Sequence, residues 1–181
     1  MPLDSGHMDY DSFLRRHRKK PLFSPVELAN QFSYRRGEIE RILPHRDPLL
    51  FLDEVTGFDA ALSAIVGMRH LPADDPVFEG HFPEYPVYPG TFQVETLGQL
   101  GVALRYFLEG GSCEIDACRR APLVRASRIL GAYFLEPVLP GATLTLLGIQ
   151  LESDCLTSRF AGQILVDGRV ACVLAGELIL R

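Results

Sequence analysis

The feature that most constrains the fold is a proline-free apolar segment directly after a proline-rich one. Residues 71–90 contain five of the thirteen prolines, so that segment lacks backbone donors and is predicted to be a stiff, irregular loop. Gly90–Leu108 contains no proline and is apolar on nearly every side, which predicts a long helix buried all round. A chain organised around one such helix needs a surrounding layer of structure to cover it.

Strand-like segments flank this helix on both sides. Leu49–Phe58 and Ala61–His70 are rich in apolar and β-branched residues and predict a hairpin. Residues 125–181 predict four more strands, with a two-residue turn at Asp167-Gly168. We therefore expect an α+β fold in which an antiparallel sheet of about six strands wraps one long central helix. One helix cannot cover both faces of such a sheet, so a homodimer or an oligomer of dimers is predicted.

The N-terminal region is predicted to be an extension with short helices. We divide the chain into an extension at residues 1–37 and a single domain at 38–181, and residues 1–8 resemble a cloning remnant. Ser24-Pro25-Val26-Glu27 has the pattern of a capping box and predicts a helix from about residue 25 to 32. Glu38–Leu43 predicts a further helical turn.

Composition and charge narrow the function classes. At 181 residues, 47% of them hydrophobic, the chain has the length of one ordinary domain with a real core. A net charge of -5 argues against a nucleic-acid binder, which needs a basic surface. No apolar run resembles a membrane span or a signal peptide, so a cytoplasmic location is expected. The four cysteines form no CxxC pair, which predicts neither a metal site nor a disulfide framework.

Polar residues on the central helix and in the loop before it are the candidates for chemistry. Glu95 is the only ionisable residue of Gly90–Leu104, and Thr91, Glu95 and Gln99 fall on one helical face. A buried carboxyl group that keeps its proton is suited to general acid catalysis, although an inert carboxylate held by Gln99 fits the same pattern. His81, in the stiff loop, is of the residue type most suited to act as a base near neutral pH, although a lone histidine is more often structural.

The start of the helix supplies a third element. If Gly90 opens the helix, its amide and the positive end of the helix dipole form a site for a developing oxyanion. Without a side chain, Gly90 also allows a substrate carbonyl to approach closely. A base, an acid and an oxyanion donor together suit removal of a proton beside a carbonyl with loss of a β-hydroxyl group.

These residues belong to motifs that resemble a known family. Residues 38–181 are similar to the (3R)-hydroxyacyl-acyl carrier protein dehydratases of the hot-dog fold, in the right order and spacing. The resemblance rests on Leu43-Pro44-His45-Arg46, on Gly80-His81-Phe82-Pro83 through Pro86 to Pro89-Gly90, on Glu95 followed by Gln99, and on Pro137-Val138-Leu139-Pro140-Gly141.

The resemblance implies an activity and a mechanism. The enzyme would convert a (3R)-3-hydroxyacyl thioester of acyl carrier protein to the trans-2-enoyl thioester, in fatty-acid, polyketide or polyene biosynthesis. It would use neither metal nor nucleotide, since the substrate carries its own phosphopantetheine. His81 would remove the α-proton, Glu95 of the partner subunit would assist departure of the hydroxyl as water, and the Gly90 amide would bind the carbonyl. Glutamate rather than aspartate at position 95 favours dehydration without isomerisation.

The same resemblance implies roles for further residues and shows where this chain departs from the family. Gln99 would steady the acid, and Thr91, Tyr85 and Tyr88 are candidate substrate contacts, although the two tyrosines fit plain packing equally well. His45 and Arg46 are interpreted as architecture. This chain departs from the family pattern at three positions. Asp47 stands where the family has an aromatic residue, Glu84 where it has a glycine, and Thr91 where it has an aliphatic residue. Because the aromatic residue is associated with gating of the acyl tunnel, Asp47 leaves acyl length and access open.

The partner and the competing functions complete the expectations. Acyl carrier proteins are acidic, so this acidic chain should keep a local basic docking surface. We place it at Arg119, Arg120, Arg125 and Arg128, with the basic run at residues 15–20 as the alternative. A hot-dog thioesterase would use the helix carboxylate but has no need of His81, and a non-catalytic thioester-binding or scaffold subunit would need neither.

Overall fold

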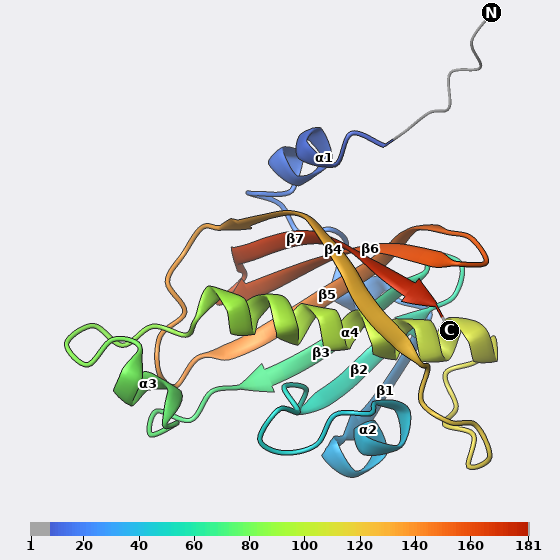
Figure 1. Cartoon of the computed structure of the whole chain (residues 1–181), viewed down its shortest axis with the longest axis horizontal. Helices are drawn as coiled ribbons and strands as arrows, with labels where there is room; N and C mark the ends of the chain where they lie inside the picture. The colour runs from blue at the N-terminus through green and yellow to red at the C-terminus, as the bar shows by residue number, and fades with distance from the viewer. Residues whose placement is uncertain (1–7, 181) are drawn as a thin grey trace, which may run out of the picture.

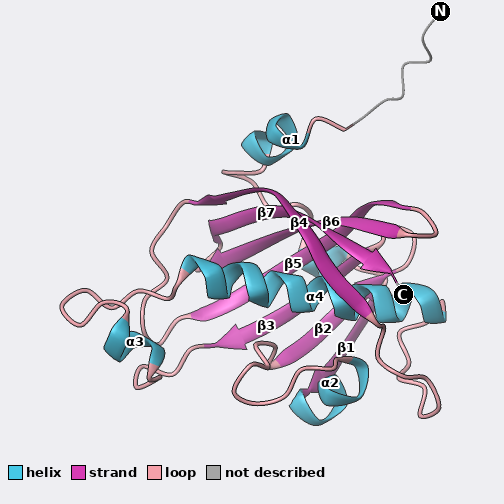
Figure 2. Ribbon diagram, in the orientation of Figure 1, coloured by secondary structure: helices cyan, strands magenta, loops and turns pink. Residues whose placement is uncertain are grey.

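The computed structural model describes residues 8–180, and in it one antiparallel sheet curves around one long helix, α4 (Figure 1). The sheet has seven strands in the order β1-β2-β3-β5-β6-β7-β4. Short helices lie at its margins (Figure 2). The strands are β1 Asn30–Arg35, β2 Glu54–Asp59, β3 Ala64–His70, β4 Val124–Phe134, β5 Thr143–Ser153, β6 Thr157–Val166 and β7 Arg169–Leu180, and the helices are α1 Tyr10–Arg16, η1 Pro25–Glu27, α2 Arg36–Ile42, α3 Val77–Gly80 and α4 Gly90–Gly110.

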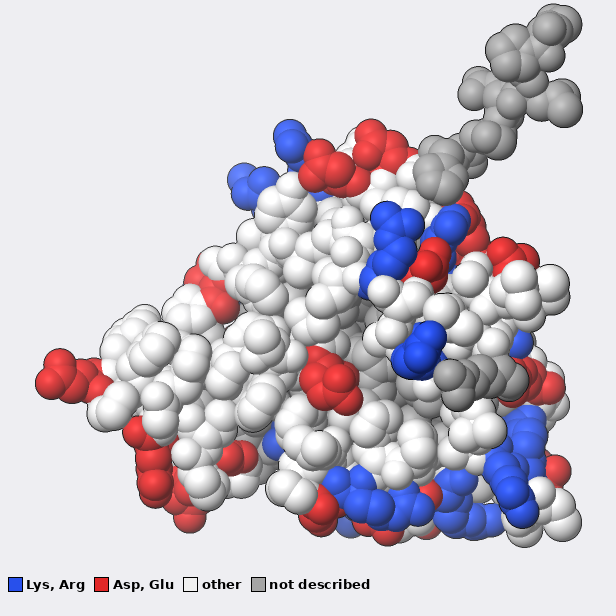
Figure 3. Space-filling view, in the orientation of Figure 1, with Lys and Arg blue, Asp and Glu red and all other residues white. Residues whose placement is uncertain are grey.

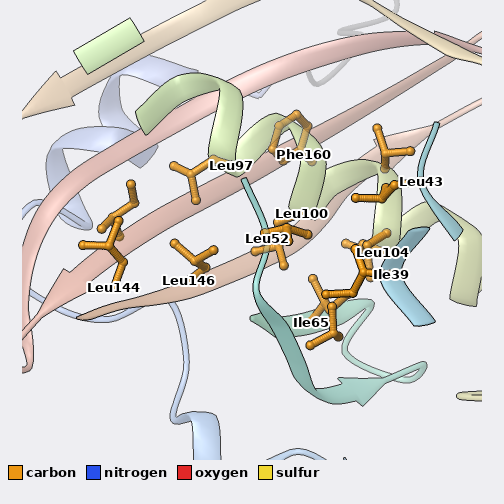
Figure 4. Packing of buried hydrophobic residues seen from close by; sticks show 14 of the residues in the cluster. Ile39, Leu43, Leu52, Ile65, Leu97, Leu100, Leu104, Leu144, Leu146 and Phe160 are labelled. Atoms are coloured by element: carbon orange, nitrogen blue, oxygen red, sulfur yellow. The ribbon is translucent and has the colours of Figure 1, made fainter. Parts of the chain in front are cut away.

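Helix α4 seats the main core against the concave face of the sheet. Leu97, Leu100 and Leu104 are almost fully buried on one side of the helix. Figure 4 shows them among side chains from the strands, including Ile65 of β3 and Phe160 of β6. The predicted helix is confirmed, but the expectation that it is buried all round is wrong, because its other face is open in the single chain.

The predicted strand hairpins are confirmed. β2 begins at Glu54, five residues later than the predicted Leu49–Phe58, and β3 lies within Ala61–His70; the two pair antiparallel with Phe58 opposite Ile65. The turn between β6 and β7 has positive φ at both Asp167 and Gly168, as a two-residue hairpin turn requires.

The N-terminal part of the sheet differs from the sequence-based expectation. The predicted helix at 25–32 is wrong: only the single 3₁₀ turn η1 forms, and Ser24 makes no side-chain cap. Asn30–Arg35 instead forms β1, which pairs with β2. The predicted turn at Glu38–Leu43 is confirmed as part of α2. A stretch assigned to the extension thus supplies the seventh strand. Residues 1–7 of the suggested cloning remnant lie outside the described residues.

Helix α1 covers the opposite face of the sheet. Side chains alternate across a strand, so Val173 and Ala175 of β7 lie on the face away from α4. Phe13 and Leu14 join these residues in a second buried cluster. The contact with β4 is close, since a Cβ atom at Gly131 would lie 2.7 Å from the Leu14 side chain. The extension is therefore packed onto the domain and stabilises β4 from behind.

A buried glutamine anchors the chain after α1. Gln163 of β6 is fully buried, and its amide nitrogen donates to the carbonyls of His17 and Lys20 at 2.6 and 2.9 Å. Its oxygen accepts from the Leu22 amide at 2.7 Å. The backbone of the basic run at 15–20 is consequently tied to the sheet while its charges face outward.

The helices and the cysteines bear on the expectations drawn from composition. No helix within residues 8–180 is long and apolar enough to cross a membrane. All four cysteines are free, and burial raises the pKa of the Cys172 thiol to about 12.

Candidate active site

His81 is fixed in orientation by the loop between α3 and α4. Its Nδ1 atom lies 2.9 Å from the carbonyl oxygen of Val87, and the Val87 amide donates to the His81 carbonyl at 2.9 Å. A carbonyl oxygen can only accept, so Nδ1 is the donor in this contact, and in the neutral tautomer the lone pair is on Nε2. The loop therefore fixes the orientation of the imidazole through Nδ1.

This imidazole faces open space beside the start of α4. A cavity of about 790 Å³ is bounded by His81, Gly90 and Thr91 on one side and by Ile129 and Phe134 of β4 on the other. Most of the lining is apolar, whereas the histidine and the helix start are polar. The cavity has the character of a site for an apolar chain with one reacting polar end.

Gly90 begins α4, as the sequence predicts. The first turn is closed by the Phe92 and Gln93 amides, both of which donate to the Pro89 carbonyl, so the Gly90 and Thr91 amides precede the intrahelical ladder. A Cβ atom at Gly90 would lie 3.0 Å from the Phe134 ring. Glycine is therefore required for packing here, and its amide lies in the wall of the cavity that His81 also lines.

Glu95 lies one turn further along α4, on the open face. Its side chain is 48% exposed, so the predicted burial of this carboxylate is wrong for the single chain. The Gln99 amide donates to its Oε1 at 2.9 Å. Gln99 itself is buried and held by the Leu49 carbonyl and the Phe51 amide, both at 2.8 Å. The glutamine thus steadies the carboxylate, as the resemblance implies.

His45 is a neighbour of Glu95 that the sequence analysis interpreted as architecture. Its Nε2 atom lies 3.5 Å from Glu95 Oε1, the same oxygen that accepts from Gln99. Its Nδ1 atom is buried, with no hydrogen-bond partner within residues 8–180. Only the Leu43-Pro44-His45-Arg46 motif pointed to this region, and it gave no indication of a contact with the helix.

Within residues 8–180, His81 and Glu95 are not in contact with each other. The two cavities lined by His81 include Gly90 but not Glu95. The side-chain contacts of Glu95 are to Gln99 and His45. A reaction that needs both groups at one substrate therefore needs a second source for one of them.

The remaining predicted contacts fall in different environments. Tyr88 is buried, whereas Tyr85 is 61% exposed; both line a smaller cavity of about 400 Å³ beside His81. Thr91 is exposed at the mouth of the larger cavity, and no hydrogen bond of its side chain occurs within the described part of the chain.

The four predicted docking arginines do not behave alike. Arg119 is turned inward, with its guanidinium carbon 3.6 Å from the Tyr106 ring centroid and a 2.6 Å hydrogen bond to the Tyr106 carbonyl. Arg120, Arg125 and Arg128 are exposed. Figure 3 also shows a basic band over α2 and an acidic one around α3. The exposed arginines Arg35, Arg41 and Arg46 lie on or beside α2, and none of them was predicted from the sequence to take part in docking.

The site contains acid and base groups rather than a set of metal ligands. Within residues 8–180, no group of three or more His, Cys, Asp or Glu side chains is arranged to hold a metal ion.

A curved antiparallel sheet wrapped around one long helix defines a protein of the hot-dog class. The chain belongs to the FabA-like domain family, which matches residues 43–175. It is 35% identical over 135 residues to the 3-hydroxyacyl-[acyl-carrier-protein] dehydratase FabZ of Magnetococcus marinus, covering 75% of this chain and 84% of that one. It is 34% identical to the FabZ of Bordetella parapertussis over 75% of this chain and 87% of that one.

Solved structures confirm the fold. The dehydratase heterocomplex ApeI:P from Xenorhabdus doucetiae superposes with a TM-score of 0.57 and 19% identity, covering 79% of this chain and 90% of that one. The Escherichia coli PaaI protein of the phenylacetic acid degradation operon superposes with a TM-score of 0.52 and 14% identity, covering 70% and 78%. At these identities the likeness concerns the hot-dog fold.

Proposed function

We propose that this chain removes water from a (3R)-3-hydroxyacyl thioester of acyl carrier protein and releases the trans-2-enoyl thioester. The observation that carries this proposal is the oriented imidazole of His81 beside the free amides at the start of α4. A thioesterase that uses the helix carboxylate has no need of that imidazole, and a binding subunit needs neither group. The family membership and the similarity to the FabZ dehydratases support the same reaction.

In the first step, Nε2 of His81 takes the α-proton of the substrate. The electron pair of the broken C–H bond moves toward the thioester carbonyl, whose oxygen becomes negative. The Gly90 amide, at the positive end of a long helix, is placed to donate to that oxygen. Since Nδ1 is held by the Val87 carbonyl, the imidazole keeps its orientation while it gains the proton.

In the second step, the bond between the β-carbon and the hydroxyl oxygen breaks. The carboxyl of Glu95 would give a proton to the departing hydroxyl, which takes the electron pair of the C–O bond and leaves as water. The electron pair that the first step moved toward the thioester carbonyl returns to form the double bond between the α- and β-carbons. The cycle closes when the proton on His81 is returned, directly or through solvent, to the carboxylate. Gln99 holds the carboxyl in place throughout.

We infer that Glu95 reaches the substrate from the partner subunit of a homodimer or an oligomer of dimers. Two exposed features support this arrangement. The open face of α4 carries Glu95, and β4 is an edge strand on which Ile129 and Phe134 are 63% and 53% exposed. Exposed apolar side chains beside an unpaired strand edge are typical of a surface that another chain covers. A second copy would cover both and bring its carboxylate to the cavity of His81.

The proposal includes an acyl carrier protein as the partner and the cytoplasm as the location. Arg120, Arg125 and Arg128, together with Arg119 at their base, would dock an acidic acyl carrier protein, and the reaction uses the phosphopantetheine of the substrate and no other cofactor. A cytoplasmic enzyme fits that partner. The docking would weaken with added salt, because exposed charges are screened.

The direct test supplies purified protein with a 3-hydroxyacyl carrier protein and follows the intact carrier by mass spectrometry. We expect the wild type to remove one water while the thioester stays intact. Glu95→Gln should lower kcat by about 10² to 10⁴-fold, the usual contribution of a general acid. Glu109→Gln is the matched control, because Glu109 lies on the same helix but is paired with Arg105. Free acid and free thiol would indicate a thioesterase, and an unchanged substrate would leave only a binding role.

A further inference from the structure

A second cavity lies behind the reacting centre. It has a volume of about 640 Å³, and Tyr88 and Phe92 belong to its wall. Phe92 also lines the large cavity beside His81, and Tyr88 lines the small one. These two rings, with centroids 5.9 Å apart in an edge-to-face arrangement, therefore separate the reacting end of the site from the cavity behind it.

The wall of this cavity combines aromatic rings with a cation. The ring centroid of Phe51 lies 5.2 Å from that of Phe92. The guanidinium of Arg69 lies over the Phe51 ring, with its central carbon 4.9 Å from the ring centroid. The lining also includes the carboxylates of Asp47, Asp53 and Asp75, and Nη1 of Arg69 donates to the Leu50 carbonyl at 3.2 Å. A wall that combines aromatic rings with charged groups favours an end group that carries oxygen over a purely aliphatic one.

Two donors in this wall are buried and unused. Tyr88 is 2% exposed and Arg69 is 8% exposed. Within residues 8–180, neither the Tyr88 hydroxyl nor Nε of Arg69 has a hydrogen-bond partner. Burial raises the pKa of Tyr88, while the nearby Thr96 hydroxyl and Arg69 guanidinium lower it in part, so the hydroxyl stays protonated and can donate. Buried donors without partners are rare in folded proteins, and an acceptor bound in the cavity would satisfy the Tyr88 hydroxyl.

The mouth of the cavity is polar and fixed. Arg36 forms ion pairs with Asp47 and Asp53, and its guanidinium also donates to the Leu50 carbonyl. Asp47 stands where the family pattern has an aromatic residue. An ion-paired carboxylate thus replaces an apolar ring in the cavity wall. A charged wall favours an acyl chain that carries oxygen over one that is hydrocarbon throughout.

We infer that this cavity is a specificity pocket for the distal end of the acyl chain, and that it selects chains whose end group carries an oxygen acceptor. The inference rests on the proposed dehydratase function and names its substrate class. The chain would run from the thioester at Gly90, past Phe92, to an end at which the Tyr88 hydroxyl and Arg69 donate to its oxygen.

The test compares matched pairs of 3-hydroxyacyl carrier proteins over a graded series of chain lengths. Within each pair one chain ends in a methyl group and the other in a terminal hydroxyl group. At the length that fills the pocket, we expect kcat/KM to be about tenfold higher for the hydroxyl-ended chain, equivalent to about 1.4 kcal/mol. Tyr88→Phe keeps the ring and removes one of the two donors, so the preference should fall severalfold while Arg69 remains. Tyr133→Phe, whose hydroxyl binds Asp11 at 2.8 Å, removes a tyrosine hydroxyl elsewhere and should leave the preference intact.

The outcomes separate the two levels of the account. Equal kcat/KM for both chain ends at every length, with water lost from both, would overturn the specificity pocket and leave the dehydratase function standing. A preference that stays at about tenfold in Tyr88→Phe would overturn the role of the Tyr88 hydroxyl. Loss of water from neither chain would overturn the proposed function and this inference with it.

Discussion

Gln99 donates a 2.9 Å hydrogen bond to Glu95 while its own position is fixed by the backbone of residues 49 and 51. The half-exposed acid therefore rests on a buried support. Gln99→Leu removes the support and leaves the Leu49 carbonyl and the Phe51 amide unsatisfied. We expect the free energy of unfolding to fall by about 2 to 3 kcal/mol and kcat to fall with it.

Glu95→Gln is the comparison that separates the two effects of Gln99. Because Glu95 is half exposed, its replacement should change the free energy of unfolding by less than about 0.5 kcal/mol while abolishing most activity. Urea titration of both variants checks this expectation. A Gln99→Leu protein with wild-type stability would contradict the support that we describe.

Gly90→Ala tests the close approach at the start of α4. The added Cβ atom would lie 3.0 Å from the Phe134 ring, in the wall of the cavity. We expect a loss of about 1 to 3 kcal/mol of stability from overpacking, and a lower kcat/KM because the ring moves into the site. Gly37→Ala is the control: a Cβ atom there meets nothing within 4 Å, and helix propensity should raise stability by up to about 1 kcal/mol.

Leu14→Ala tests whether the N-terminal extension is part of the folded domain. Leu14 is 1% exposed and packs against β4 at Gly131. Truncation of a buried leucine should lower the free energy of unfolding by about 2 to 4 kcal/mol. Val26→Ala, at a side chain that is 84% exposed, should have little effect. Equal stabilities of the two variants would mean that the extension does not pack on the sheet in solution.

Acid should weaken the pair between β6 and β7. Hydrogen bonds from Arg159 and then Ser127 lower the pKa of Glu177 below its ordinary value of 4.5. A carboxyl group whose pKa is lower in the folded state contributes stability that is fully present above its unfolded-state pKa. This stability is lost as the pH falls through the folded-state pKa. Glu177→Gln should therefore lose less stability than the wild type between about pH 7 and about pH 3 in urea titrations. Glu79→Gln, at an exposed position, should lose as much as the wild type.

The comparison with the sequence shows where local patterns suffice. The helix at Gly90–Gly110 was predictable because a proline-rich loop ends at it and its apolar content fits no exposed element. β1 was missed because Ser24-Pro25-Val26-Glu27 matches a helix start, whereas Asn30–Arg35 becomes a strand through its pairing with β2. That pairing is non-local and leaves no signal in the segment itself.

The residues of the candidate site stay a prediction from the sequence, and their arrangement could not be read from it. His81, Gly90, Glu95 and Gln99 were all identified from the sequence, and the structure brings Glu95 and Gln99 into contact. The exposure of Glu95 could not be read from the sequence, because an apolar helix face looks the same whether the sheet or a second chain covers it. His45 was missed as a neighbour of Glu95 because the contact depends on how the loop before β2 folds back onto α4.

The most direct test of the central account uses dimers with one defect in each chain. His81→Ala and Glu95→Gln chains, carrying different tags, are purified together as heterodimers and assayed for loss of water from a 3-hydroxyacyl carrier protein. If each site combines His81 of one chain with Glu95 of the other, one of the two sites is intact, and about half of the wild-type activity should return. Heterodimers of a wild-type chain with a chain that carries both substitutions should be inactive. The composite site would be contradicted by the opposite pattern. In that pattern the His81→Ala/Glu95→Gln heterodimers are inactive, and the heterodimers of a wild-type chain with a doubly substituted chain are active.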